Sequence, residues 1–227
     1  MRMPLTNLLG VSPTVSILPG SPFKVIVNGP GAMSFQVFSA SSLVVDWGDG
    51  NQNTYNGNTV ANHTYADSNL YALKFISGTV GRLNFAYQTL FQESIVQVSN
   101  QVPASLGLTS IQSMFQGCVN CHVFPDALFD ACTGLTALSY ALQGTLYDHS
   151  LGSMSIASVT YAFDMLSGSS MSTANYSATL IGWAAQAPNI PANITFGATG
   201  LHYNASAVAA RAVLTGTYGW TITDAGL

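Results

Sequence analysis

The chain has 227 residues, of which 48% are hydrophobic and only 6% are charged, with a formal net charge of −4. This composition allows a substantial core and excludes intrinsic disorder, which requires low hydrophobicity and high net charge. Five lysines and arginines are too few for a phosphate-binding surface, and no apolar run reaches the about 18 residues of a membrane-spanning helix, so we expect neither a nucleic-acid nor a membrane partner.

Residues 1–22 are rich in proline and contain no continuous apolar stretch, so we predict an extended N-terminal arm. The segment is a poor signal peptide because it lacks a continuous apolar region. An arm of this kind, together with a neutral polar surface that costs little to desolvate, favours a subunit that docks on its neighbours in an assembly.

Residues 23–95 contain short alternating runs of β-branched and aromatic residues separated by Gly, Asn and Pro turns, the pattern of an antiparallel β-sandwich. In one of these runs, Leu43, Val45 and Trp47 share a face that we expect to lie in the core. Asp46 then points to the opposite side.

Two sequence words in this segment resemble the signature of PKD-type Ig-like modules. They are Trp47-Gly48-Asp49-Gly50, in which Asp-Gly is a strong turn signal, and His63-Thr64-Tyr65. The resemblance implies a seven-stranded β-sandwich that serves as a binding or spacer domain. It also implies a structural role for the motif residues, which are Trp47, Gly48, Asp49, Gly50, His63 and Tyr65.

Residues 96–170 contain a repeated pattern. Three stretches are similar, LTSIQSMFQGC from Leu108, LTALSYALQGT from Leu135 and IASVTYAFDML from Ile156, so the steps are 27 and 21 residues. Such repeats must stack on their neighbours to bury their apolar faces. The pattern resembles the BspA-like leucine-rich repeats of bacterial surface proteins and of some phage proteins, in which a PKD-like module often precedes the repeats.

Residues 171–227 resemble the terminal unit of the same family and are predicted to form an α/β cap. The alanine-rich segment 205–215 indicates a helix that is capped by Asn204 and ends before Gly216. Residues 220–223 are predicted to form a last strand. The fold class is therefore mainly β with short helices: an Ig-like β-sandwich, a short irregular leucine-rich-repeat solenoid and an α/β C-terminal cap.

The three cysteines lie in the repeat segment. Cys118-Val119-Asn120-Cys121-His122 has the spelling of a c-type haem attachment site, and with Cys132 the same residues could supply a Cys₃His zinc site. A disulfide is also conceivable. We favour free buried thiols that act as small apolar groups, because Cys118 and Cys132 occupy equivalent positions in the repeat. We therefore expect no cofactor and no metal.

Two sets of carboxylates are candidate sites. Asp46, Asp49 and Asp67 could bind calcium, although a turn-closing role for Asp49 is favoured. The aspartates of the repeats could form a glycosidase pair, although solvated loop caps are favoured; they are Asp126, Asp130, Asp148 and Asp164. Without a nucleophile elbow of the G-x-S-x-G type, we expect no enzyme.

These observations predict a non-enzymatic phage virion structural protein, such as a head decoration, collar or tail/fibre-type subunit. Its partners would be other virion proteins or copies of itself, in an oligomer within an assembly. The alternative is a bacterial cell-surface adhesin that binds a host surface protein or glycan, and a weaker alternative is a carbohydrate-active enzyme.

Overall fold

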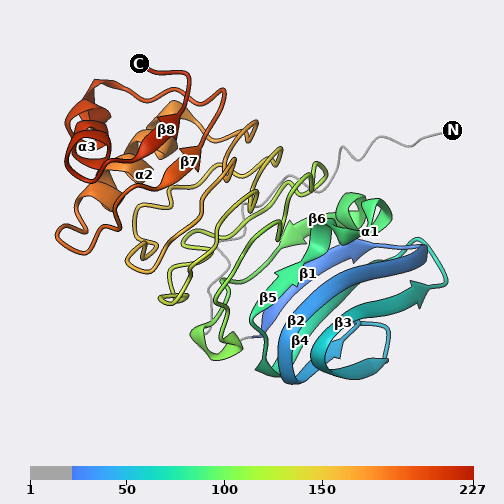
Figure 1. The fold of residues 1–227 in the computed structure, drawn as a ribbon. Helices are drawn as coiled ribbons and strands as arrows, with labels where there is room; N and C mark the ends of the chain where they lie inside the picture. The colour runs from blue at the N-terminus through green and yellow to red at the C-terminus, as the bar shows by residue number, and fades with distance from the viewer. Residues whose placement is uncertain (1–21) are drawn as a thin grey trace, which may run out of the picture.

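The computed structural model describes residues 22–227, so the predicted arm lies outside the described residues except for Pro22. The protein is mainly β, with a six-stranded antiparallel sheet and a few short helices (Figure 1). The sheet has the order β3-β2-β4-β1-β6, and β5 pairs with β2 beside this path. Its strands are β1 (Phe23–Asn28), β2 (Gly31–Asp46), β3 (Gln52–Tyr65), β4 (Leu70–Thr79), β5 (Arg82–Asn84) and β6 (Ile95–Val98).

Alternating side chains give the sheet one buried face. Leu43, Val45 and Trp47 are completely buried, which confirms the predicted inner face of this run. Asp46 points the other way and lies 3.3 Å from the Lys74 ammonium. At the centre of the core, the Phe35 ring contacts four other aromatic rings at centroid distances of 5.3–6.0 Å, those of Trp47, Phe75, Phe85 and Phe91.

The long strand β2 is bent and shared between neighbours. It pairs with β3 along its length, while on its other side its first half pairs with β5 and its second half with β4. The bend lies around Ala40, where the register shifts and both Ser39 and Ser42 have positive φ. A 3₁₀ turn, η1 (Phe85–Tyr87), and helix α1 (Thr89–Ser94) follow β5 and turn the rings of Phe85 and Phe91 into the core.

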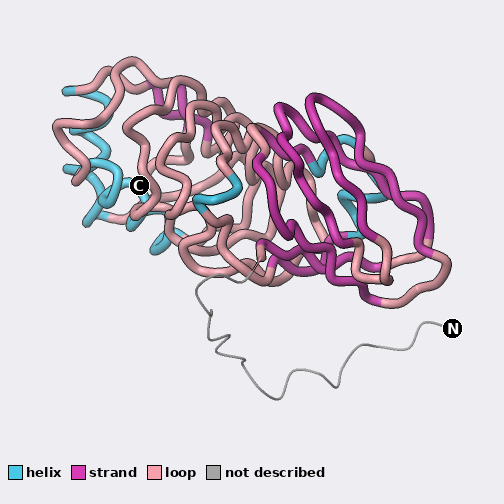
Figure 2. The backbone as a smooth tube through the Cα atoms, turned by 90° about the horizontal axis from the view of Figure 1, so that it is seen from below, coloured by secondary structure: helices cyan, strands magenta, loops and turns pink. Residues whose placement is uncertain are grey.

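The middle of the chain is a stack of loops rather than a regular solenoid. Within the described residues 99–172 there is no strand, and the one helical turn is the 3₁₀ turn η2 (Ala104–Leu106). Isolated parallel bridges nevertheless join successive loops, from Arg82 of β5 to Ser110, Ala137 and Tyr161 in turn. Figure 2 shows these loops between the strands at one end of the molecule and most of the helices at the other.

The bridges correct the predicted spacing of the third copy. Ser110 pairs with Ala137, 27 residues further on, as expected, but Ala137 pairs with Tyr161, a step of 24 rather than 21. Val159, not Ile156, therefore takes the place of Leu135. The error has a simple physical cause, because Ile156 and Val159 are both buried and hydrophobicity alone does not distinguish them.

Backbone conformation repeats with the same corrected spacing. Ser113, Tyr140 and Asp164 all have positive φ, at 55°, 61° and 47°. Four residues after each of them comes a glycine with φ of 66–68°, a conformation that favours glycine; these are Gly117, Gly144 and Gly168. The loops therefore follow one backbone template, although their side chains differ.

The C-terminal part contains helices and a small parallel sheet of β7 and β8. The Asn204 side chain accepts a hydrogen bond from Ser206 N (3.1 Å), which confirms the predicted cap. The helical segment runs on to Thr217, so Gly216 lies inside its last turn and not beyond it. The elements are α2 (Thr173–Ala184), β7 (Thr195–Gly197), η3 (Ala205–Ala207), α3 (Val208–Ala212), the π-helical turn η4 (Val213–Thr217) and β8 (Thr221–Thr223), close to the predicted last strand.

One hydrophobic core runs through the sheet, the loops and the C-terminal part, from Phe23 to Trp220. Its largest fully buried side chains are Trp47 near the N-terminal end and Trp183 near the C-terminal end. None of the helices in residues 22–227 is both long and apolar enough to cross a membrane.

Candidate functional site

The two motif words come together at one end of the sheet. Trp47, Gly48, Asp49 and Gly50 form the turn between β2 and β3, and His63 and Tyr65 lie at the end of β3. His63 Nε2 is 2.7 Å from Asp49 Oδ2, and the His63 ring stacks on the Trp47 indole with centroids 4.8 Å apart. The Tyr65 hydroxyl donates a hydrogen bond to Trp47 O (2.7 Å).

The environment of this cluster favours a structural role for it. Burial acts to raise the pKa of Asp49, but the hydrogen bond from the Asn51 N–H and the contact with His63 lower it below its usual value. Burial raises the pKa of Tyr65, so its hydroxyl stays a donor. Gly48 has a φ of 85°, and an added Cβ would lie 2.7 Å from Ala72 O. The motif thus closes the β2–β3 turn and ties it to the end of β3.

The other two carboxylates of the candidate calcium set, Asp46 and Asp67, do not join Asp49. Asp46 binds Lys74, whereas Asp67 Oδ1 accepts hydrogen bonds from the Tyr71 hydroxyl (2.6 Å) and from Asn69 N (3.0 Å). Across residues 22–227 no three His, Cys, Asp or Glu side chains are grouped so that they could hold a metal ion.

The cysteines lie inside the core as free thiols. Cys118, Cys121 and Cys132 are all buried and unpaired within the described chain. Burial raises the pKa of Cys121 to about 12 and that of Cys132 to about 11, so both are held as neutral thiols. His122 is exposed at the surface. The structure therefore places the two cysteines of the C-x-x-C-H spelling in the core and its histidine at the surface.

Two of the four aspartates of the loops bind neighbouring loops. Asp126 Oδ1 is 2.6 Å from His149 Nδ1, and Asp148 Oδ1 accepts a hydrogen bond from Ser172 N (2.7 Å). Asp164 accepts one from the Ser167 hydroxyl (2.8 Å). For Asp130, one carboxylate oxygen is buried with no hydrogen-bond partner among the described residues, as is the Tyr147 hydroxyl. Asp126 and Asp148 therefore fasten neighbouring loops of the stack, whereas the Asp164 bond lies within one loop.

The basic side chains are also used within the molecule. Lys74 pairs with Asp46, and the Arg211 guanidinium pairs with the Asp224 carboxylate, whose side chain is only 3% exposed. The Arg82 guanidinium lies 3.7 Å above the Phe38 ring. Three of the five lysines and arginines of the chain are engaged in this way, and only 6% of all residues are charged, so the surface carries few charges.

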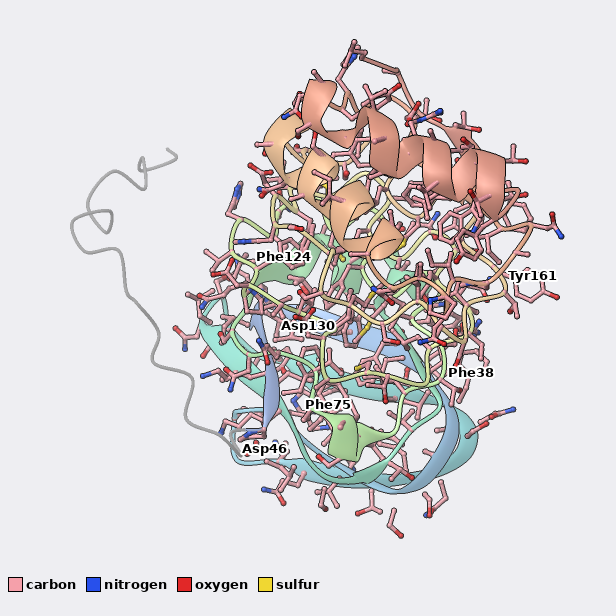
Figure 3. All side chains as sticks on the ribbon, turned by 90° about the vertical axis from the view of Figure 1, so that its left-hand side faces the viewer. Phe38, Asp46, Phe75, Phe124, Asp130 and Tyr161 are labelled. Carbon is pink, nitrogen blue, oxygen red and sulfur yellow. The ribbon has the colours of Figure 1, made fainter. Side chains whose placement is uncertain are left out.

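One exposed aromatic pair was not predicted from the sequence. Tyr161 and Phe163 are 58% and 45% exposed, and their rings stand side by side with centroids 6.5 Å apart. Because both residues alternate with the buried Ala162, their side chains project from the same face. Arg82 shares this face, because the row of parallel bridges links it to Tyr161. Phe38 and Tyr161 lie along the same side of the molecule (Figure 3). The alternation of large and small residues in Tyr161-Ala162-Phe163 is the sequence pattern from which this exposed pair could have been predicted.

Comparison with known proteins gives no match, whether to family models, to curated proteins or to solved structures.

Proposed function

We propose that this chain is a non-enzymatic structural protein of a phage virion, a head-decoration, collar or tail/fibre-type subunit. The observation that carries the proposal is the small number of charges on the surface. Covering such a surface requires the desolvation of few charges, because only 6% of the residues are charged and two of the basic side chains, Lys74 and Arg211, are already in ion pairs within the molecule. Its partners are other virion proteins or copies of itself.

The finer architecture forms part of this proposal. A PKD-type Ig-like module at residues 23–95 is supported by the contacts among Trp47, Asp49, His63 and Tyr65. A leucine-rich-repeat-like stack at residues 96–170 is supported by the parallel bridges and by the repeated positive-φ positions. Residues 171–227 then form the cap that covers the last loop. Such a combination presents surfaces for binding.

The test is co-purification with particles. A virion subunit sediments with purified phage particles at a fixed copy number that matches a symmetry of the particle, which quantitative mass spectrometry measures. Deletion of residues 1–22, the predicted arm, is expected to release it. A full-length chain that never sediments with particles contradicts the proposal.

The second candidate is a bacterial surface adhesin, and the exposed pair of Tyr161 and Phe163 favours it. Exposed aromatic rings are typical of protein–protein contacts and of stacking against flat ligands. An adhesin would bind immobilised host matrix protein or glycan as an isolated chain, and replacement of both rings by alanine would abolish that binding. Binding that survives the double replacement would remove this argument.

A further inference from the structure

One row of side chains crosses the outer surface from the sheet to the stacked loops. The register pairs Phe38 of β2 with Arg82 of β5, and the parallel bridges continue from Arg82 to Ser110, Ala137 and Tyr161. Because paired residues of neighbouring strands project to the same side of a sheet, these five side chains share one face. Figure 3 shows Phe38 and Tyr161, the two ends of the row, on the same side of the molecule.

The middle of this row is low, and its two ends stand higher. Ser110 and Ala137 have short, half-buried side chains, whereas the long Arg82 side chain lies on one side of them and the exposed Tyr161 ring on the other. Neighbouring rungs are about 4.8 Å apart, so the steps from Arg82 to Tyr161 span about 14 Å. The row is therefore a strip with a cationic end and an aromatic end.

The Arg82 guanidinium at the cationic end is held in place but has no anionic partner. It lies 3.7 Å above the Phe38 ring, and Arg82 Nη1 donates a hydrogen bond to Gln112 Oε1 (3.1 Å). Lys74 and Arg211 each pair with an aspartate, whereas Arg82 forms no ion pair with the described residues. Burial lowers the pKa of Arg82. A carboxylate brought by a ligand would supply the missing counter-charge.

The aromatic end suits a sugar better than a protein partner. Since a whole aromatic side chain offers about 150–250 Å², the exposed fractions of Tyr161 and Phe163 amount to about 200 Å². A stable protein interface needs about 800 Å² on each partner. A sugar needs only one ring, because the C–H groups of its flat face stack on an aromatic side chain while its hydroxyls bind polar neighbours. The short Ala137 beside Tyr161 leaves room for such stacking.

We propose that the row from Arg82 to Tyr161 binds an acidic oligosaccharide, one that carries carboxylates on its sugar rings. One sugar stacks on Tyr161, the chain runs over Ala137 and Ser110, and a carboxylate further along accepts hydrogen bonds from the Arg82 guanidinium. The Gln112 amide, whose oxygen is fixed by Arg82, offers its nitrogen as a donor to a sugar hydroxyl. This binding rests on the proposed structural role and deepens it, because a tail/fibre-type subunit would use the row to bind an acidic surface polysaccharide.

Titration calorimetry of the full-length chain with a short oligogalacturonate tests the ligand class. We expect binding that weakens as the salt concentration rises. Methyl esterification of the same oligomer keeps the sugar rings but removes the charge, and is expected to weaken binding about tenfold or more. A polyglutamate peptide, which has carboxylates without sugar rings, is expected not to bind. A chain that does not bind oligogalacturonate, or that binds the ester or the peptide equally well, overturns the inference.

Two matched pairs of variants test the location. Arg82→Gln is expected to weaken binding about tenfold or more, whereas Lys24→Gln removes the same charge from β1 and leaves binding unchanged. Tyr161→Ala is expected to weaken it about three- to tenfold, whereas Tyr87→Ala removes an exposed ring from η1 without effect. Thermal unfolding verifies that each variant is folded. Variants of the row that bind as well as their controls overturn the placement.

Particle sedimentation separates this inference from the virion role. A Tyr161→Ala variant that no longer binds the oligosaccharide but still sediments with particles supports the binding row and leaves the virion role intact. An unaltered chain that binds the oligosaccharide but never sediments with particles contradicts the virion role alone.

Discussion

Helix α2 packs very closely on the stack at Gly182. This glycine faces Gly152 in the loop beneath, and an added Cβ would lie 2.6 Å from the Gly152 carbonyl carbon. The loop has little freedom to move, because Trp183 Nε1 donates a hydrogen bond to Leu151 O (2.8 Å) and Leu151 N donates one to Thr179 Oγ1 (2.9 Å). We therefore expect Gly182→Ala to destabilise the protein.

The expected size results from two opposing effects. Alanine is favoured over glycine inside a helix by about 1 kcal/mol. Overpacking costs about 1–3 kcal/mol, and the upper end applies here because the obstructing atoms belong to backbone pinned on both sides. The net loss is about 1–2 kcal/mol, which lowers Tm by about 2–8 °C for a chain of this length.

Thermal and urea unfolding measure this effect, and Gly216→Ala is the matched control. Gly216 also lies in a helical turn, but an added Cβ there has no neighbour within 4 Å. This control is expected to retain or slightly raise the stability. If Gly182→Ala melts at or above the temperature of the unaltered chain, the close packing of α2 on the loop at Gly152 is wrong.

Three further predictions concern the motif cluster and the thiols. Tyr65→Phe removes the hydrogen bond to Trp47 O and is expected to lower the free energy of unfolding by about 1–2 kcal/mol in urea titrations; an unchanged midpoint would show that the bond is dispensable. Because the pKa of Asp49 is lowered in the folded state, its contribution to stability is present above the unfolded pKa of about 4 and is lost as the pH falls through the lower folded value. A plot of Tm against pH should therefore be flatter in the acid range for Asp49→Asn, and identical slopes would contradict this assignment. Burial raises the pKa of Cys121 to about 12 and that of Cys132 to about 11. The thiols should therefore resist a thiol reagent at pH 8 until the chain is unfolded. Rapid labelling of the native protein would show that the core opens at these residues.

Local patterns in the sequence predicted the parts of the fold that depend on neighbouring residues. The buried face of Leu43, Val45 and Trp47 follows from alternation, and the Asn204 cap follows from side-chain chemistry. The resemblance implied a structural role for the two motif segments, but not that they would contact each other. Their physical link, the contact between His63 and Asp49, is plain only in the structure.

The parts that were missed depend on pairings between distant residues. The place of Val159 rather than Ile156 in the third copy is decided by backbone bridges, since both side chains are buried. The pairing of Arg82 with Ser110, which joins β5 to the first loop, also involves a short strand with little pattern of its own. The exposure of Tyr161 and Phe163 depends on this register as well, because a shift of one residue would exchange buried and exposed positions.

The row of bridges, which continues from Ala162 to Phe196 of β7, also determines a length. Each loop adds one rung to the row, and neighbouring rungs of a β-ladder are about 4.8 Å apart. Duplication or deletion of one loop of 24–27 residues would thus lengthen or shorten the molecule by one such increment and leave the sheet and the C-terminal helices unchanged. The number of loops thus sets the distance between the sheet and the C-terminal part.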